Sequence, residues 1–272
     1  MKSAALFFPF DLFGSAGAGE GVLLLADALR EILEDNRREK APTRARSYAK
    51  KVILEEFSFD DLPSYLDWQG KAREAIRKSL GKDFLLWFTG NHLGALPLYE
   101  ELGRQDGESL VLQFDAHLDI HHFDECSKEP SHGNFLMHCS APLPMVINVG
   151  HRELLLPANH VHQYYQLVIP ADQFTSDTDA ALVLLQDAVL SVDRILIDID
   201  CDVFDPAFFP AVTRCLPFGL SPAQVLRAIN AVWSERIVGV SFSEFNPAGD
   251  RADLSLTTLI WLMEYLLIKR HE

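Results

Sequence analysis

Cysteine is scarce in this sequence, and no two cysteines are closely spaced. The 272 residues include four of them, Cys126, Cys139, Cys201 and Cys215, with no CxxC pair. This pattern excludes the common zinc knuckles and the thioredoxin-type dithiol motif. We therefore expect reduced thiols in a cytoplasmic protein.

Long apolar runs and low-complexity segments are missing as well. The most apolar late stretch, residues 259–268, contains Glu264 and is too short to span a bilayer. Near the start, Pro9 and Asp11 cut short an apolar run that briefly imitates a signal peptide. No Pro/Gly/Ser-rich linker divides the chain, so we expect a single domain over residues 1–272.

Basic residues are outnumbered by acidic ones. The chain has 24 Lys and Arg against 39 Asp and Glu, a formal net charge of −15. Such a chain is a poor general binder of nucleic acid or of an anionic membrane surface. The acidity suits a cationic substrate, and a solvated acidic surface is the alternative interpretation. The sequence leaves open whether the protein is a homo-oligomer.

Short apolar runs alternate with longer amphipathic ones, which predicts alternating strands and helices. The expected strands are residues 4–8, 52–57, 84–88, 110–114, 145–149, 167–169, 194–199 and 237–243. The expected helices are residues 20–33, 71–80, 96–102, 180–190, 222–234 and 255–269. Near-continuous apolar strands are typical of a parallel sheet covered on both faces. We therefore predict an α/β protein with three α/β/α layers and a mostly parallel sheet of about eight strands.

Acidic residues and histidines directly follow four of these strands. Because the carboxyl ends of parallel strands meet at one edge of the sheet, where ligands bind, such residues are expected to lie close together. They are His92, Asp115, His117, Asp119, Asp200, Asp202 and Glu244.

The spacing of these residues is typical of a metal site. Asp115, His117 and Asp119 alternate along one segment, so their side chains project to the same side. Asp200 and Asp202 repeat the arrangement on another strand. Carboxylates mixed with imidazoles suit a divalent first-row metal such as Mn²⁺. An unpaired cluster of four carboxylates would be costly, and two divalent ions would balance its charge.

The motifs around these residues resemble those of the arginase/agmatinase ureohydrolases. They are GNH at 90–92, DAHLD at 115–119, DIDCDVFDP at 198–206 and SEFNP at 243–247, in that order. The resemblance implies an arginase-like fold and a binuclear manganese site that hydrolyses a guanidino group to urea and a primary amine. It also implies two ligand sets. His92, Asp115, Asp119 and Asp200 would hold one ion, and His117, Asp202, Asp115 and Asp200 the other.

The same resemblance implies catalytic roles near the metal site. Glu244 would receive the substrate guanidinium, a planar cation that matches a carboxylate bidentately, with a capping or salt-bridging role as the alternative. Asp119 or His132 would supply a proton to the leaving amine, and His138 competes with His132 for this role. Asp198 either supports a ligand or is purely structural.

Several departures from the family patterns bear on the substrate. Asn91 stands where the family has an aspartate, residues 212–217 replace a Gly-Thr-Gly-Thr-Pro segment, and the loop after Asp119 lacks the arginase pattern for holding a free α-amino acid. In that loop, His121 and His122 either line the entrance or lie on the surface. The segments 8–15 and 90–97 are most similar to those of the peptide arginases, which convert arginine side chains in ribosomally made peptides to ornithine.

We therefore expect an arginine-containing peptide as the substrate and two Mn²⁺ ions as the cofactor. A small guanidino compound, as for agmatinases and arginases, is the first alternative. An arginase-fold amide deacetylase and a non-catalytic metal-binding homologue are further alternatives. The presence of both Asp119 and Asp202 favours the ureohydrolase over the deacetylase. The retention of Asp115 and Asp200, the two aspartates that the resemblance makes bridging, favours it over the non-catalytic homologue.

Overall fold

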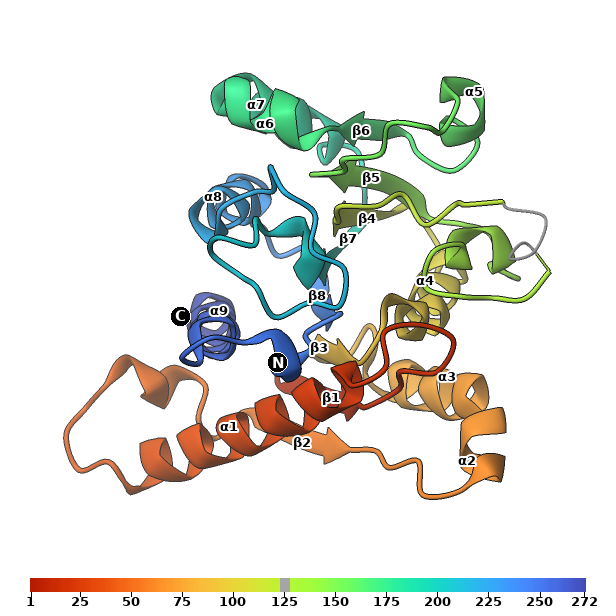
Figure 1. Cartoon of the computed structure of the whole chain (residues 1–272). Coiled ribbons are helices and arrows are strands. Elements are labelled where there is room, and N and C mark those ends of the chain that lie inside the picture. The colour runs from red at the N-terminus through yellow and green to blue at the C-terminus, as the bar shows by residue number, and fades with distance from the viewer. Residues whose placement is uncertain (123–127) are drawn as a thin grey trace.

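A single eight-stranded sheet runs through the computed structural model, which describes residues 1–122 and 128–272 (Figure 1). Its strands are β1 (Ser3–Phe8), β2 (Val52–Glu56), β3 (Phe84–Thr89), β4 (Ser109–Phe114), β5 (Met145–Val149), β6 (Leu167–Ile169), β7 (Arg194–Asp200) and β8 (Ile237–Ser243). Their order is β2-β1-β3-β8-β7-β4-β5-β6, and all neighbours are parallel. The predicted α/β class and the eight parallel strands are confirmed.

Helices cover both faces of this sheet. The strands are apolar throughout because their side chains enter two cores: Ala5 and Phe7 of β1 face one, and Leu6 and Phe8 face the other. The first core is closed by α1 (Ala18–Arg38), α6 (Ala171–Ser176), α7 (Thr178–Ala188), α8 (Pro222–Val232) and α9 (Leu254–His271). The second is closed by α3 (Trp68–Ser79), α4 (Leu96–Gly103) and α5 (Ala158–Val161). The short helix α2 (Leu62–Leu66) precedes α3 and has no buried residue.

The helix predictions hold for the long helices, and α1 is longer than expected. It continues to Arg38, with Arg37 and Arg38 in its last turn, where positive charge is favourable. Arg37 also donates to the carbonyl of Ala49 at 3.1 Å. The short helices α2, α5 and α6 have too few turns to show a helical period in the sequence.

The topology places four strand ends at the centre of one edge. β3 and β4 are consecutive in the chain, but β8 and β7 lie between them in the sheet. The segments that follow these four strands therefore gather at the middle of the carboxyl edge, where the chain direction across the sheet changes. All the predicted site residues that follow a strand belong to these segments.

The helices and cysteines of the described chain bear on two of the sequence expectations. None of its helices combines the length and the apolar character needed to cross a membrane. Cys139, Cys201 and Cys215 are not paired in disulfides in the described part of the chain, and Cys126 lies outside it.

Candidate metal centre and active site

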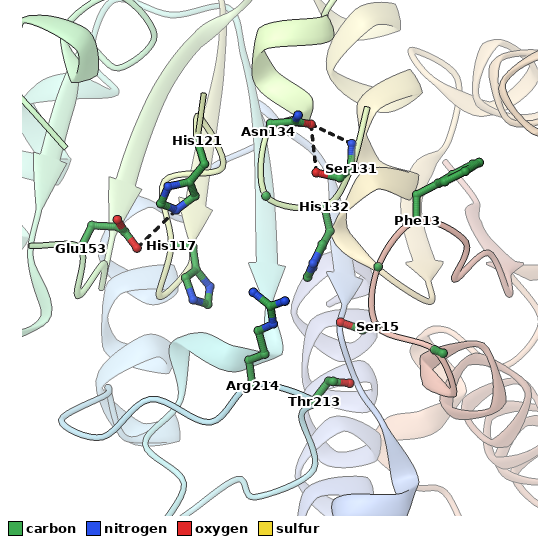
Figure 2. Close-up of a pocket in the computed structure, with 13 residues that line it drawn as sticks. Phe13, Ser15, His117, His121, Ser131, His132, Asn134, Glu153, Thr213 and Arg214 are labelled. Carbon is green, nitrogen blue, oxygen red and sulfur yellow. Dashed lines mark hydrogen bonds and ion pairs between the residues drawn. The ribbon is translucent and has the colours of Figure 1, made fainter. Parts of the chain in front are cut away.

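A broad cleft of about 780 Å³ opens at the carboxyl edge of the sheet (Figure 2). It adjoins an inner cavity of about 60 Å³ whose lining includes Asp119, Asp200, Asp202 and Glu244. His117, His132 and Arg214 line both spaces, and Figure 2 shows their side chains pointing toward one another across the cleft. The cleft therefore leads to the predicted metal site.

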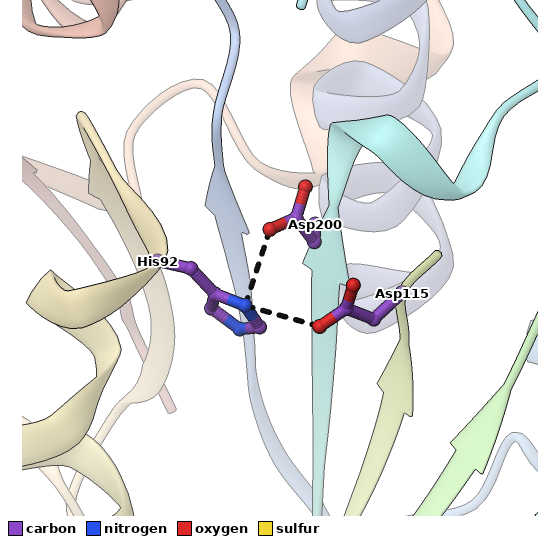
Figure 3. A group of neighbouring side chains, drawn as sticks. All are labelled: His92, Asp115 and Asp200. Carbon is purple, nitrogen blue, oxygen red and sulfur yellow. Dashed lines mark ion pairs between the residues drawn. The ribbon is translucent and has the colours of Figure 1, made fainter. Parts of the chain in front are cut away.

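Three carboxylates converge on His92, which begins the 3₁₀ turn η2 (His92–Ala95) after β3. Figure 3 shows two of them, Asp115 and Asp200. His92 Nδ1 lies 3.2 Å from Asp115 Oδ2, 3.1 Å from Asp200 Oδ2 and 2.9 Å from Asp119 Oδ2. All four residues are buried. Nevertheless, Nδ1 has no hydrogen-bond partner of acceptable geometry in the described part of the chain. A buried ring nitrogen facing carboxylate oxygens in this way has the arrangement of a metal ligand set.

Asp198 holds the opposite side of the His92 ring. Its Oδ2 lies 2.8 Å from His92 Nε2 and accepts a hydrogen bond from the Tyr99 hydroxyl at 2.6 Å. Its Oδ1 accepts one from the Ser241 hydroxyl. A carboxylate in this position favours the tautomer that leaves Nδ1 free to bind a metal. Of the two roles expected for Asp198, these contacts favour support of His92.

A second group is built around His117. Its Nδ1 lies 2.8 Å from Asp202 Oδ2 and 3.9 Å from Asp115 Oδ1. Ligand atoms of Asp115, His117 and Asp202 all lie within 4.8 Å of one another, as do those of His92, Asp115 and Asp200. Asp115 is thus common to both groups, whereas Asp200 belongs only to the first at this separation. The bridging role expected of Asp200 stays a prediction.

Backbone hydrogen bonds fix three of the carboxylates in a common way. One oxygen of Asp115 accepts the N–H of His117 at 2.7 Å, and one oxygen of Asp200 accepts the N–H of Asp202 at 2.9 Å. One oxygen of Asp202 accepts the N–H of Ala116 at 3.1 Å, which joins the segments after β7 and β4. In each case the other oxygen faces a histidine. The group is therefore held in a ligand arrangement by the backbone itself.

The packing of like charges perturbs the acid–base properties of this group. Burial, together with the negative charge of the neighbouring Asp119, raises the pKa of Asp115 to about 7. Burial alone would lower the pKa of His117, but the neighbouring carboxylates, Asp202 foremost, together outweigh this effect and raise the pKa to about 10. Such groups retain protons, and a divalent cation competes with those protons for the same lone pairs.

Glu244 and His132 lie together at the inner cavity. Glu244 Oε1 accepts the backbone N–H of His92 at 2.9 Å and lies 3.3 Å from His132 Nδ1. This contact raises the pKa of His132. His138, the competing proton donor, ends the turn η3 (Phe135–His138) and lines neither cavity. The geometry therefore favours His132 over His138.

Two of the expected catalytic residues have a left-handed backbone. The φ angle is 49° at Asp119 and 65° at Glu244. A non-glycine residue in this conformation costs about 1–3 kcal/mol and persists where its surroundings fix it. At Glu244, the backbone N–H donates to the carbonyl of Gly90 at 2.7 Å. The fold thus holds both side chains toward the cavity against a local conformational preference.

The two histidines after the DAHLD motif separate in the structure. His121 lines the cleft, with its Nε2 3.4 Å from Glu153 Oε1. His122 packs its ring against His160 at 4.4 Å between centroids and lines neither cavity. Of the two positions that the sequence left open, His121 therefore lies at the entrance and His122 does not.

Arg152 is a residue that the sequence did not reveal. Its guanidinium donates to the carbonyls of Asp202 and Val203, and also to those of Gly150 and Leu216. Its backbone N–H donates to Ala116 at 2.8 Å. Arg152 therefore ties the segment after β5 to those that carry Asp115 and Asp202. Its position directly after a predicted strand, 145–149, was the one available signal.

Comparison with known proteins identifies the family of this chain. The model of the Arginase family matches residues 4–268, and the chain belongs to this family. It is 26% identical to an agmatinase of Photorhabdus laumondii over 91% of this chain and 80% of that one. It is also 26% identical to an N(1)-aminopropylagmatine ureohydrolase of Thermus thermophilus, over 69% of this chain and 64% of that one.

Solved structures show the same fold. The arginase of Bacillus subtilis superposes with a TM-score of 0.76 at 20% identity, covering 98% of each chain. The predicted arginase-like fold is therefore confirmed. With the family membership, the chain is an enzyme of the ureohydrolase class, a hydrolase of guanidino carbon–nitrogen bonds.

Proposed function

We propose that this chain is a single-domain ureohydrolase, spanning residues 1–272, that uses two Mn²⁺ ions. The observation that carries the proposal is the buried His92 Nδ1, which faces carboxylate oxygens without hydrogen-bonding to them. The donor set of imidazole nitrogens and carboxylate oxygens fits such ions. The ligands would be His92, Asp115, His117, Asp119, Asp200 and Asp202.

The chemistry requires a nucleophile and an oriented guanidinium. Two divalent ions in this site would lower the pKa of water, so that hydroxide is available near neutral pH. Glu244 is rigidly placed beside the ligands by its hydrogen bond from the His92 backbone. Its carboxylate would bind the planar guanidinium and hold its carbon toward the ligand group. Glu244 lines the inner cavity together with the candidate ligands Asp119, Asp200 and Asp202, which supports its role in binding the guanidinium.

Collapse of the attacked guanidine requires a proton on the departing amine. His132 lies at the cavity beside Glu244, and its raised pKa keeps it protonated to higher pH than an ordinary histidine. Asp119 lines the same cavity. Either residue would pass a proton to the leaving nitrogen, and the products are urea and a primary amine.

For the substrate, we propose an arginine side chain within a peptide. The inner cavity, at about 60 Å³, is sized for the guanidine end alone, whereas the cleft beyond it has about 780 Å³. A cleft of this size can accept residues that flank an arginine. The names of the relatives favour the second candidate, a small guanidino compound such as agmatine.

Peptides and small molecules can be compared directly by mass spectrometry. We expect a peptide with arginine to lose about 42 Da through urea release in the presence of Mn²⁺. Its kcat/KM is expected to exceed that of free arginine roughly tenfold, since flanking residues add binding along the cleft. Agmatine serves as the control that lacks a carboxylate. Equal turnover of agmatine or free arginine would replace the peptide with the small-molecule substrate.

A further inference from the structure

Arg214 is an unexpected side chain in a site for a cationic group. It lines both the cleft and the inner cavity, and Glu244 also lines the inner cavity. No described carboxylate lies within ion-pair distance of its guanidinium, whereas Glu153 across the cleft is engaged by His121. A fixed positive charge at this place repels a substrate that carries a second cation.

The charges of the site balance if the substrate has both signs. The four carboxylates of Asp115, Asp119, Asp200 and Asp202 would be matched by two divalent ions. Glu244 then remains for the guanidinium, and Arg214 remains for an anion. Both line the one inner cavity. Because Arg214 also lines the cleft, the anion would lie close to the guanidine in space in the bound substrate.

The loop that carries Arg214 is anchored on several sides. The Thr213 hydroxyl accepts a hydrogen bond from Asn246 Nδ2 at 3.1 Å, and the N–H of Asn246 donates to the carbonyl of Ala211 at 2.8 Å. Arg152 also donates to the carbonyl of Leu216, two residues beyond Arg214. Because the oxygen of Thr213 accepts from Asn246, its own proton can be donated to a ligand in the cleft.

We propose that Arg214, assisted by the Thr213 hydroxyl, binds a carboxylate that the substrate carries close to its guanidine. This assignment rests on the proposed ureohydrolase function. The carboxylate has two sources: a small guanidino acid, or a peptide in which arginine is C-terminal or adjoins an acidic residue. A guanidinium pairs with a carboxylate in either setting through the same bidentate geometry.

Three small guanidines of similar length test whether the charge of the substrate's tail, rather than its shape, determines turnover. The probes are zwitterionic 4-guanidinobutyrate, monocationic butylguanidine with an uncharged tail, and dicationic agmatine, measured with the Mn²⁺-loaded enzyme. We expect kcat/KM to fall roughly tenfold from the acid to butylguanidine, and further to agmatine. For peptides, the matched pair is one sequence ending in arginine as a free acid and as an amide. A second pair has an internal arginine next to Glu or Gln.

Substitutions then assign the preference to Arg214. In Arg214→Gln, the advantage of the acid over butylguanidine should disappear, mainly through a higher KM for the acid, whereas kcat/KM for butylguanidine should change much less. Arg214→Lys should keep part of the advantage, and Arg214→Glu should favour agmatine. The exposed Arg251→Gln is the control. The product 4-aminobutyrate should inhibit the Arg214→Gln enzyme more weakly than wild type, which reports binding without turnover.

The outcomes separate this inference from the function on which it rests. If butylguanidine is hydrolysed but the acids have no advantage, or if Arg214→Gln lowers all three probes equally, the carboxylate site is wrong and the ureohydrolase stands. If none of the guanidines or peptides releases urea, the proposed function itself fails. An advantage confined to peptide acids or to 4-guanidinobutyrate identifies the source of the carboxylate.

Discussion

At the scale of single residues, Asp115 has the largest expected effect because it belongs to both His/Asp groups. We expect Asp115→Ala to lose both metal ions and all turnover, since it removes a shared ligand and leaves two cations to repel each other. Metal analysis after gel filtration measures the stoichiometry. Asp187→Ala, on the exposed face of α7, is the control and should retain two ions. Two ions retained in Asp115→Ala would contradict the shared position.

A substitution of Glu244 tests substrate binding independently of metal binding. Glu244→Gln should keep both ions but lower kcat/KM for guanidino substrates, because the amide removes the charge that faces the guanidinium. The expected loss is about 2–5 kcal/mol of transition-state stabilisation, as for one side of a buried charge pair. Steady-state kinetics on metal-loaded protein measures it. A kcat/KM near that of wild type would make Glu244 a structural residue.

The candidate ligand residues could be recognised from their spacing, but the contacts around them could not. Asp115 and His117 stand in one motif, whereas the hydrogen bond between the His92 backbone and Glu244 joins residues 152 positions apart. The pattern of neighbouring residues in the sequence does not reveal contacts between residues so far apart. The same reason hides Arg152, whose guanidinium contacts four carbonyls that only the folded loops bring together.

At the scale of elements, the contact between α3 and α4 depends on a buried acid. Glu100 is 1% exposed, pairs with Arg73 at 2.6 Å and accepts the backbone N–H of Ser140 at 3.0 Å. Burial alone would raise its pKa, but the bonds from Ser140 and Arg73 outweigh burial and lower it. A carboxyl with a lowered pKa stabilises the fold above its unfolded pKa of about 4.3, and this contribution is lost as the pH falls through the folded pKa.

The corresponding prediction concerns Glu100→Gln. At neutral pH, this variant should lose about 1–3 kcal/mol of unfolding free energy, because Arg73 and Ser140 lose a charged partner. The difference from wild type should shrink as the pH falls below about 4. Urea unfolding at several pH values measures both effects. Glu74→Gln, which breaks an exposed pair with Lys78, should stay close to wild type. A pH-independent loss would argue against the role of the Glu100 charge.

Elements were predicted best where a local signal and burial agree. All six residues of β3 are buried, so its apolar run is visible in the sequence. The start of α8 was also marked, by Ser221 followed by Pro222, and the structure adds a reciprocal capping pair with Gln224. The end of α1 was missed, since its last turn is polar and is held by a contact to Ala49. Tertiary contacts of polar residues have no periodic pattern.

At the scale of the whole molecule, metal and stability should be coupled. Ligands that bind only the folded state stabilise it, by about 2.7 kcal/mol when free ligand is a hundredfold above Kd. We therefore expect chelation to lower the Tm and added Mn²⁺ to restore it. Differential scanning calorimetry of the same sample before and after chelation measures the shift. An unchanged Tm would mean that the buried carboxylates are satisfied without cations, which would contradict the proposed centre.

The position of β7 and β8 between β3 and β4 has a consequence for the order in which the protein is made. A nascent chain that has just completed β4 has His92 and Asp115 but has neither of the two strands that join them. Only when the last third of the chain leaves the ribosome can β7 and β8 fill the gap and bring Asp200 and Asp202 to the others. If the proposed centre binds metal, capture of that metal would therefore coincide with completion of the sheet, and we expect translation that stops before β8 to leave no partly active enzyme.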